Sequence, residues 1–403
     1  MGFKELFKFR GFTLLWSGQI ITRIGDAIET LALMWIALEL TGSALFMGTV
    51  GICSVIPNLL LMAIGGVCAD RWSRKRIMVA CDIARGFIIM SIPILYNMGA
   101  LQPYHILIVA FCVSIFESFF TPAIDATIPN LVDEKNLMTA ISARRMSSSF
   151  ANVIGMGLGG SLIYLVSAPN AVVIDGLSFF VSAIMIMAIH VPFSKRAPTT
   201  TNKDPAIWSD LKEGLQFVRN QDVLWMILIM MIVVNLVFAP VGIAIPILSE
   251  RVLGTGELGY SLLMMSLAIG MLTGGFVMGQ WGSRFRKHST LLYGGMGISL
   301  PLGFILLFNT LAPCIIMLFV SGFSMSVVNV PINTLMQEVT PDHIRGRVNS
   351  IAGTFCIAAM PLGMGFGGAL IDWLGVKLVF LLISITVLIT GCSFACTKTL
   401  RRY

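Results

Sequence analysis

Several ionisable residues lie in segments that are otherwise apolar. Arg23, Asp26 and Glu29 follow one another at steps of three near the N-terminus, and Glu117 falls near the middle of residues 104–127. Steps of three place side chains along one face of a helix, so Arg23 can pair with Asp26. Removal from water favours the neutral form of a carboxyl group, whereas a nearby arginine favours its charged form. We predict that Asp26, Glu29 and Glu117 bind and release protons or cations; the alternative is a static ion pair between Arg23 and Asp26.

Other polar residues in apolar segments have simpler explanations. Asp82 and Arg85 are three residues apart, and we expect them to form a structural ion pair near the inner membrane surface. Asp175 follows the start of an apolar segment at 170–191, where a carboxylate can lie beside a helix N-terminus. Three asparagines either donate and accept hydrogen bonds in a cavity or join neighbouring helices: Asn235, Asn329 and Asn333.

The composition places these residues in a membrane. Of the 403 residues, 56% are hydrophobic and 12% are charged, whereas soluble domains carry about 25% charged residues. A spanning helix needs about 20 mostly apolar residues. The predicted spans are 12–38, 45–68, 77–97, 104–127, 140–165, 170–191, 224–248, 257–280, 289–309, 312–337, 348–371 and 376–396.

The basic residues give an orientation. Arg251 and Lys377 lie in predicted outer loops, Arg23 and Arg85 lie within spans, and the other lysines and arginines fall in loops on the opposite side or in the two termini. Cytoplasmic loops of membrane proteins carry an excess of lysine and arginine. We therefore expect a multi-pass protein of the cytoplasmic (inner) cell membrane with both termini in the cytoplasm. The distribution also explains the net charge of +7 without a nucleic-acid partner.

A polar linker divides the chain into two groups of six spans. The predicted parts are an N-terminal half at 1–191, a linker at 192–222 and a C-terminal half at 223–403. The linker contains an expected amphipathic helix with apolar residues at helical spacing: Trp208, Leu211, Leu215 and Val218. Such duplication is typical of transporters whose substrate site lies between the halves.

Several chemistries are disfavoured. The four histidines have no metal-ligand spacing, so we predict no metal site and no cofactor. All eight cysteines lie in apolar runs, so we expect no disulfide. A phosphate-binding loop of the Gly-x-x-x-x-Gly-Lys-Ser/Thr type is missing, so the chain itself does not use ATP. No nucleophile constellation stands out either, which predicts that the chain is not an enzyme.

The segment from Gly66 to Arg76, GVCADRWSRKR, resembles the signature loop of the major facilitator superfamily. The start Trp16-Ser-Gly-Gln19, the stretch FFTPAIDATIPNLV and the late triplet Arg345-Gly-Arg347 resemble the macrolide-efflux branch of the third drug–proton antiporter family. The resemblance implies an all-α membrane fold of twelve helices in two pseudo-symmetric six-helix halves. It also implies that helices 1 and 4 line the central cavity of the N-terminal half, so Glu117 and the charges of helix 1 are expected to face each other.

In this superfamily the signature loop acts as a conformational gate. We expect Gly66 to allow a close approach of two helices, Asp70 to face the start of the helix after Arg347, and Arg71 or Arg74 to pair with Asp125. Glu338 is expected to pair with Arg345 or Arg347. The predicted gate residues are Gly66, Asp70, Arg71, Arg74, Lys75, Asp125, Arg345 and Arg347. The simpler alternative is that these charges only fix the orientation of the chain.

Four glycines of the fifth span resemble the antiporter signature Gly-x-x-x-Gly-Pro-x-x-Gly-Gly: Gly155, Gly157, Gly159 and Gly160. Met156 occupies the place nearest to the expected proline. Close helix packing by small residues explains the same pattern whether or not transport is coupled to protons.

These observations predict a monomeric secondary transporter that exports lipophilic small molecules, macrolide-like or other drugs, by alternating access in exchange for protons. The 25 methionines suit apolar ligands of varied shape. Exporters of an endogenous metabolite such as a siderophore, and a transport-inactive membrane sensor, stay open as alternatives. The excess of acids over arginines favours neutral or cationic cargo over an anionic siderophore.

Overall fold

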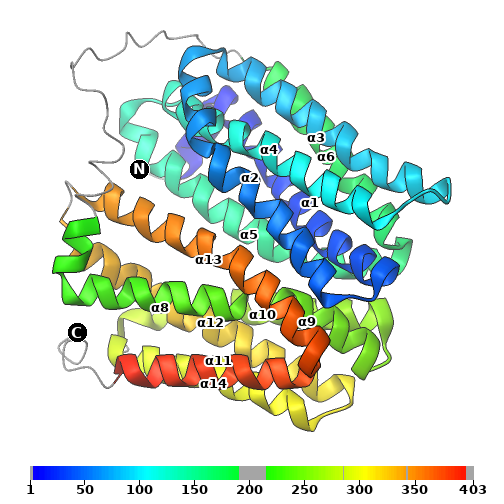
Figure 1. Cartoon of the computed structure of the whole chain (residues 1–403). Coiled ribbons are helices and arrows are strands. Elements are labelled where there is room, and N and C mark those ends of the chain that lie inside the picture. The colour runs from blue at the N-terminus through cyan, green and yellow to red at the C-terminus, as the bar shows by residue number, and fades with distance from the viewer. Residues whose placement is uncertain (1–2, 190–214, 285, 342–343, 396–403) are drawn as a thin grey trace. The chain divides into compact units, whose positions relative to one another are not determined.

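A computed structural model describes residues 3–189, 215–284, 286–341 and 344–395. Every regular element in this part of the chain is a helix. Contacts divide the chain into two compact units, Met1–Arg196 and Ala197–Tyr403, and Figure 1 shows the helices of both. The predicted linker helix falls mostly outside the described residues, although residues 215–220 are helical.

The N-terminal unit contains six long helices and two short 3-10 turns. Its elements are η1 Phe3–Lys8, α1 Arg10–Thr41, α2 Ala44–Arg71, α3 Arg74–Asn97, α4 Pro103–Thr127, η2 Ile128–Asn130, α5 Glu134–Val166 and α6 Ala168–Met187. Helix α1 packs against α5 and α6, α2 packs against α4, and α3 packs against α4 and α6. Residues of α1, α3, α4 and α6 therefore meet inside this unit.

The C-terminal unit has the same number of spans, but one of them is broken. Its elements are α8 Asp222–Phe238, α9 Val241–Ile247, the π turn η3 Leu248–Val252, α10 Gly256–Trp281, η4 Gly282–Arg284, α11 Lys287–Phe304, η5 Ile305–Leu307, α12 Leu311–Val339, α13 Arg345–Leu374 and α14 Val376–Ala395. Its closest pairs are α10 with α12, α11 with α12 and α14, and α8 with α13.

Eleven segments of the described residues are long and apolar enough to cross a membrane. Helix α1 is not among them, because Arg23, Asp26 and Glu29 lower its hydropathy. It is nevertheless one continuous helix of 32 residues with most of its apolar C-terminal half buried. Its charges are tolerated because other helices of the unit provide partners for them, as described below.

The predicted span over 224–248 corresponds to one membrane-crossing segment, Asp222–Val252, but the helix within it is interrupted. The chain turns at Ala239–Pro240 between α8 and α9, and Pro240 has no N–H to donate to a helix. Helix α13 packs closely at this break: a Cβ at Gly363 would overlap the carbonyl oxygen of Leu236, and one at Gly367 would overlap the Pro240 ring. Small residues on α13 therefore accommodate the break.

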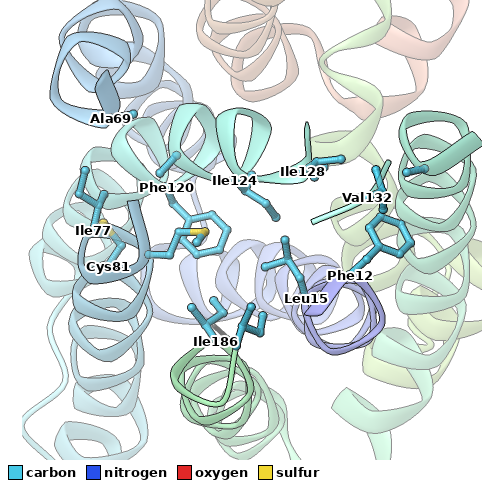
Figure 2. Close-up of a cluster of buried hydrophobic side chains, with 14 of the residues drawn as sticks. Phe12, Leu15, Ala69, Ile77, Cys81, Phe120, Ile124, Ile128, Val132 and Ile186 are labelled. Atoms are coloured by element: carbon cyan, nitrogen blue, oxygen red, sulfur yellow. The ribbon is translucent and has the colours of Figure 1, made fainter. Parts of the chain in front are cut away.

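One end of the N-terminal unit is closed by apolar side chains. Figure 2 shows Leu15 of α1, Ile77 and Cys81 of α3, Phe120 and Ile124 of α4, and Ile186 near the end of α6 pointing toward a common centre. All of these are at most 9% exposed. They form an apolar core at the end of the unit that carries the α2–α3 connection.

Glycines bring α5 close to α1. A Cβ at Gly155 would lie 2.7 Å from the carbonyl oxygen of Ile24 and from the Ala27 Cβ. A Cβ at Gly159 would lie 3.1 Å from the Ile28 Cα. The absence of side chains at these two positions therefore fixes how deeply α1 lies against α5.

Candidate functional site in the N-terminal unit

Arg23 joins helices α1 and α4. Its Nη1 atom lies 3.3 Å from Asp26 Oδ2 on the same helix and 3.2 Å from Glu117 Oε1 on α4. The structure thus brings Asp26 and Glu117 together through one guanidinium group. All three side chains keep between 21% and 30% of their surface exposed, so this part of the cluster reaches the surface of the unit.

Arg85 of α3 is a second cation in the same cluster. Its Nη2 atom lies 2.8 Å from Asp26 Oδ1, and its guanidinium carbon lies 4.0 Å from the centre of the Phe179 ring on α6. Ring faces attract cations, which helps to hold a guanidinium away from water. Asp26 is therefore clamped by two arginines from two helices.

The predicted pair of Asp82 with Arg85 is wrong. Arg85 pairs with Asp26 instead, and neither carboxylate oxygen of Asp82 has a hydrogen-bond partner in the described part of the chain. The long arginine side chain reaches across to α1, a contact that spacing along α3 cannot reveal. Asp82 is fully buried, where an uncompensated charge is very costly.

Asp175 belongs to the cluster, which its position near the start of the predicted segment 170–191 did not indicate. It lies about two turns into α6 and is fully buried. One oxygen from each of Asp26, Glu29 and Asp175 lies within 4.8 Å of the other two. Ser178 Oγ donates to Asp175 Oδ1 over 3.1 Å, and a Cβ at Gly25 would overlap that same oxygen.

A sequence signal for Asp175 existed. It is an isolated carboxylate in an apolar segment, and the same criterion identified Glu117. Its nearness to the start of the segment suggested a helix-end role, whereas its depth in α6 decides its neighbours. Arg85 was missed for a similar reason, because Asp82 offered a partner closer in sequence.

Acids outnumber bases in this cluster. Its two arginines are Arg23 and Arg85, and its acids are Asp26, Glu29, Asp82, Glu117 and Asp175. Both arginines are engaged by Asp26, and one also by Glu117. A metal ion is a poor fit to the remaining oxygens, because hard cations take six or more oxygen ligands and Asp26 is already held by guanidinium groups.

The predicted gate residues of the N-terminal unit have partners other than those expected. Asp125 forms an ion pair with Arg144 of α5, not with Arg71 or Arg74. Arg74 Nη1 donates to the Ala126 carbonyl over 2.6 Å, and Lys75 Nζ donates to the Met187 carbonyl over 2.7 Å. These cations satisfy carbonyl groups at the C-terminal ends of α4 and α6, where positive charge is favourable.

Within the N-terminal unit, Gly66 makes no close contact with another helix. A Cβ added there would meet no atom within 4 Å, whereas one at the neighbouring Gly65 would overlap the Ser118 carbonyl oxygen of α4. The glycine that allows close α2–α4 packing is therefore Gly65, one position before the signature segment. That Asp70 faces the start of α13 stays a prediction.

In the C-terminal unit, Arg345 Nη2 donates to the Gln337 and Thr340 carbonyls over 3.1 and 3.3 Å. Glu338 forms an ion pair with Lys287 of α11, a partner that the sequence did not suggest. Arg345 thus satisfies carbonyls at the end of α12, as Arg74 does for α4.

Asn235 and Asn329 line a cavity within the C-terminal unit. Its volume is about 100 Å³ and its walls come from α8, α11, α12 and α14. Met230, Met231 and Met325 contribute to its apolar surface, and Asn235 Nδ2 donates to the Met231 carbonyl over 2.8 Å. Asn333 is exposed and is not part of this lining.

Residues 15–360 and 241–401 match the Major Facilitator Superfamily. The chain belongs to this superfamily. It is a multi-pass membrane transporter of small molecules and not an enzyme. The all-α membrane fold and the family predicted from the sequence are confirmed.

Related transporters align with nearly the whole chain. Macrolide efflux protein A of Streptococcus pyogenes is 28% identical over 92% of both chains. The multidrug efflux pump Tap of Mycolicibacterium fortuitum is 25% identical over 91% of this chain and 90% of its own. The predicted resemblance to the macrolide-efflux branch is thereby confirmed.

Solved structures share the fold. A bacterial homologue of the iron transporter ferroportin, in an inward-facing state, has a TM-score of 0.74 at 13% identity and covers 98% of this chain and 100% of its own. The nucleoside transporter NupG has a TM-score of 0.71 at 13% identity, with 97% and 99% coverage.

Proposed function

We propose that this transporter exports lipophilic small molecules, macrolide-like or other drugs, in exchange for protons, acting as a monomer with both termini in the cytoplasm. The observation that carries the proposal is the bridge from Asp26 through Arg23 to Glu117. It joins two helices through carboxylates that keep part of their surface exposed. The names of the relatives support efflux, and the excess of acids supports neutral or cationic cargo.

The bridge responds to protons by a simple route. A charged Glu117 holds Arg23 toward α4, whereas a proton on Glu117 leaves Arg23 paired with Asp26 alone. The α1–α4 contact is weaker in the second state, because a charge-assisted hydrogen bond becomes a neutral one. Proton binding from one side and release to the other then bias the exchange between inward-open and outward-open states.

We propose that the signature segment from Gly66 to Arg76 acts as a conformational gate through Asp70 and Arg71. Arg345 and Arg347, at the start of α13, are proposed to belong to the same gate. Arg74 and Lys75 support it by holding the ends of α4 and α6, through the hydrogen bonds described above. The Asp125–Arg144 pair ties α4 to α5 at the same end of the unit.

The test is transport in proteoliposomes with an imposed pH gradient. Efflux of erythromycin and of tetraphenylphosphonium is measured for the wild type, Asp26→Asn and Glu117→Gln. We expect gradient-driven flux in the wild type and its loss in both variants, with downhill exchange of drug retained in Glu117→Gln.

Glu134→Gln is the matched control, since Glu134 is an exposed carboxylate at the start of α5. Flux that ignores the gradient, or that Asp26→Asn and Glu117→Gln leave intact, contradicts proton exchange at this site.

A further inference from the structure

Glu29 of α1 and Asp175 of α6 form a pair of buried carboxyl groups beside the arginine bridge. Glu29 is 7% exposed and Asp175 is fully buried. One oxygen of each lies within 4.8 Å of the other. Asp175 Oδ1 accepts a hydrogen bond from Ser178, while Asp175 Oδ2 has no partner among the described residues. An unsatisfied carboxylate oxygen in such a place needs a proton or a cation.

Neither Arg23 nor Arg85 forms an ion pair with Glu29 or Asp175. Arg85 lies 2.8 Å from Asp26, and Arg23 is shared between Asp26 and Glu117. Within the described residues, no lysine or arginine forms an ion pair with Glu29 or Asp175. Two like charges at this separation repel by about 3–4 kcal/mol at an effective dielectric constant of 20, in addition to the cost of burial. The two carboxyl groups therefore do not both ionise.

The charged groups around Glu29 and Asp175 do not add an uncompensated positive charge that would let both carboxyl groups ionise. Helix α1 contributes Asp26 and α3 contributes Arg85, which neutralise each other in part. Helix α3 also contributes the uncompensated Asp82, and α4 contributes Glu117. The acidic and basic residues of α5 lie in its first half, at Glu134, Lys135, Arg144 and Arg145, whereas α5 contacts α1 through Gly155 and Gly159.

We propose that Glu29 and Asp175 share one proton, and that this proton is exchanged during transport together with the one that binds Glu117. The protonated carboxyl donates its O–H to an oxygen of the other, so that the pair carries a single negative charge. Gly25 permits the contact, because any larger residue there would displace the Asp175 carboxylate. The shared proton stands on the geometry of the pair, whereas its exchange rests on the export function proposed above.

The first test needs no substrate. Infrared difference spectra of the protein in liposomes detect the C=O stretch of protonated carboxyl groups. We expect a band at neutral pH that weakens at alkaline pH, is altered in Asp175→Asn and loses intensity in the Glu29→Gln/Asp175→Asn double variant. Glu134→Gln is the control and should leave the band unchanged. Thermal unfolding of each variant shows that it is folded, and Asp175→Asn alone serves if the double variant does not fold.

Two results overturn the shared proton. One is a band that the double variant leaves unchanged. The other is stoichiometric binding of Mn²⁺ at neutral pH, measured calorimetrically with MnCl₂ and abolished in Asp175→Asn, which assigns the site to a metal ion. We expect no such binding.

The second test separates this inference from the export function. In proteoliposomes we expect at least a tenfold loss of gradient-driven tetraphenylphosphonium efflux in Asp175→Asn. If the wild type shows gradient-driven flux that Asp175→Asn retains, the exchanged proton lies elsewhere and the export function stands. If the wild type shows no gradient-driven flux but the infrared band depends on Asp175, proton-driven export fails and the shared proton stands.

Discussion

The two units carry their polar groups in different places. In the N-terminal unit, acids and arginines lie in the middle of α1, α3, α4 and α6 and pair across helices. In the C-terminal unit, the acidic and basic residues of the described spans lie near the helix ends, as Lys287, Glu338 and Lys377 do. Its interior instead contains a cavity of about 100 Å³ with methionine and asparagine walls.

This difference suggests a division of labour between halves of similar plan. Charged networks in a low-dielectric medium are costly and respond strongly to protons. Apolar cavities with a few amide groups respond weakly to pH but adapt to ligands of different shape. One unit is thus suited to coupling and the other to recognition.

The largest effect is expected from Arg85→Ala. This change leaves Asp26 with one cation instead of two in a buried cluster, and breaking such a pair costs about 3–5 kcal/mol. Thermal unfolding of the purified protein should show a marked loss of stability, and gradient-driven transport should disappear. Arg144→Ala, which breaks a more exposed pair with Asp125, is the control. Equal stability of the two variants would mean that the central cluster is no more important than a surface pair.

A smaller effect separates two adjacent glycines. Gly65→Ala places a methyl group against the Ser118 carbonyl of α4, whereas Gly66→Ala places one in open space. We expect Gly65→Ala to lose about 1–3 kcal/mol through overpacking, and Gly66→Ala to be nearly neutral. Thermal unfolding and the yield of monodisperse protein provide the measurement. The opposite order would restore Gly66 as the packing glycine.

A crossed pair of variants examines the division of labour directly. Asn329→Leu removes a polar group from the cavity wall of the C-terminal unit, so the KM for erythromycin should change by up to about tenfold, or about 1.4 kcal/mol. The dependence of flux on the pH gradient should persist. Glu117→Gln should show the reverse pattern, with coupling lost and the KM for exchange little changed. If both variants change both quantities alike, the division of labour between units is wrong.

The smallest effect is expected from Asp125→Asn. The Asp125 side chain is 49% exposed, so its pair with Arg144 is largely hydrated. Such pairs contribute about 0–1 kcal/mol, and thermal unfolding should change little. A large destabilisation would show that the ends of α4 and α5 depend on this contact.

The comparison of the two units also shows which features of the fold residue patterns predict. Apolar segment length identified the spans, because each must cross the same thickness of hydrocarbon. The break at Pro240 was missed, because a proline can be tolerated in a long apolar segment when a neighbouring helix accommodates it. Here α13 does so with Gly363 and Gly367.

The sequence by itself determined the fold class, the family and the presence of ionisable residues within the spans that become α1 and α4. Hydropathy, the placement of charges and the motif from Gly66 to Arg76 are features of short stretches of chain, so they can be recognised in the sequence alone. Only the tertiary structure decided that Arg85 serves Asp26, that Asp175 faces Glu29 and that Gly65 meets Ser118. Those contacts depend on the rotation and depth of each helix against its neighbours, and spacing along a single helix contains no information about either.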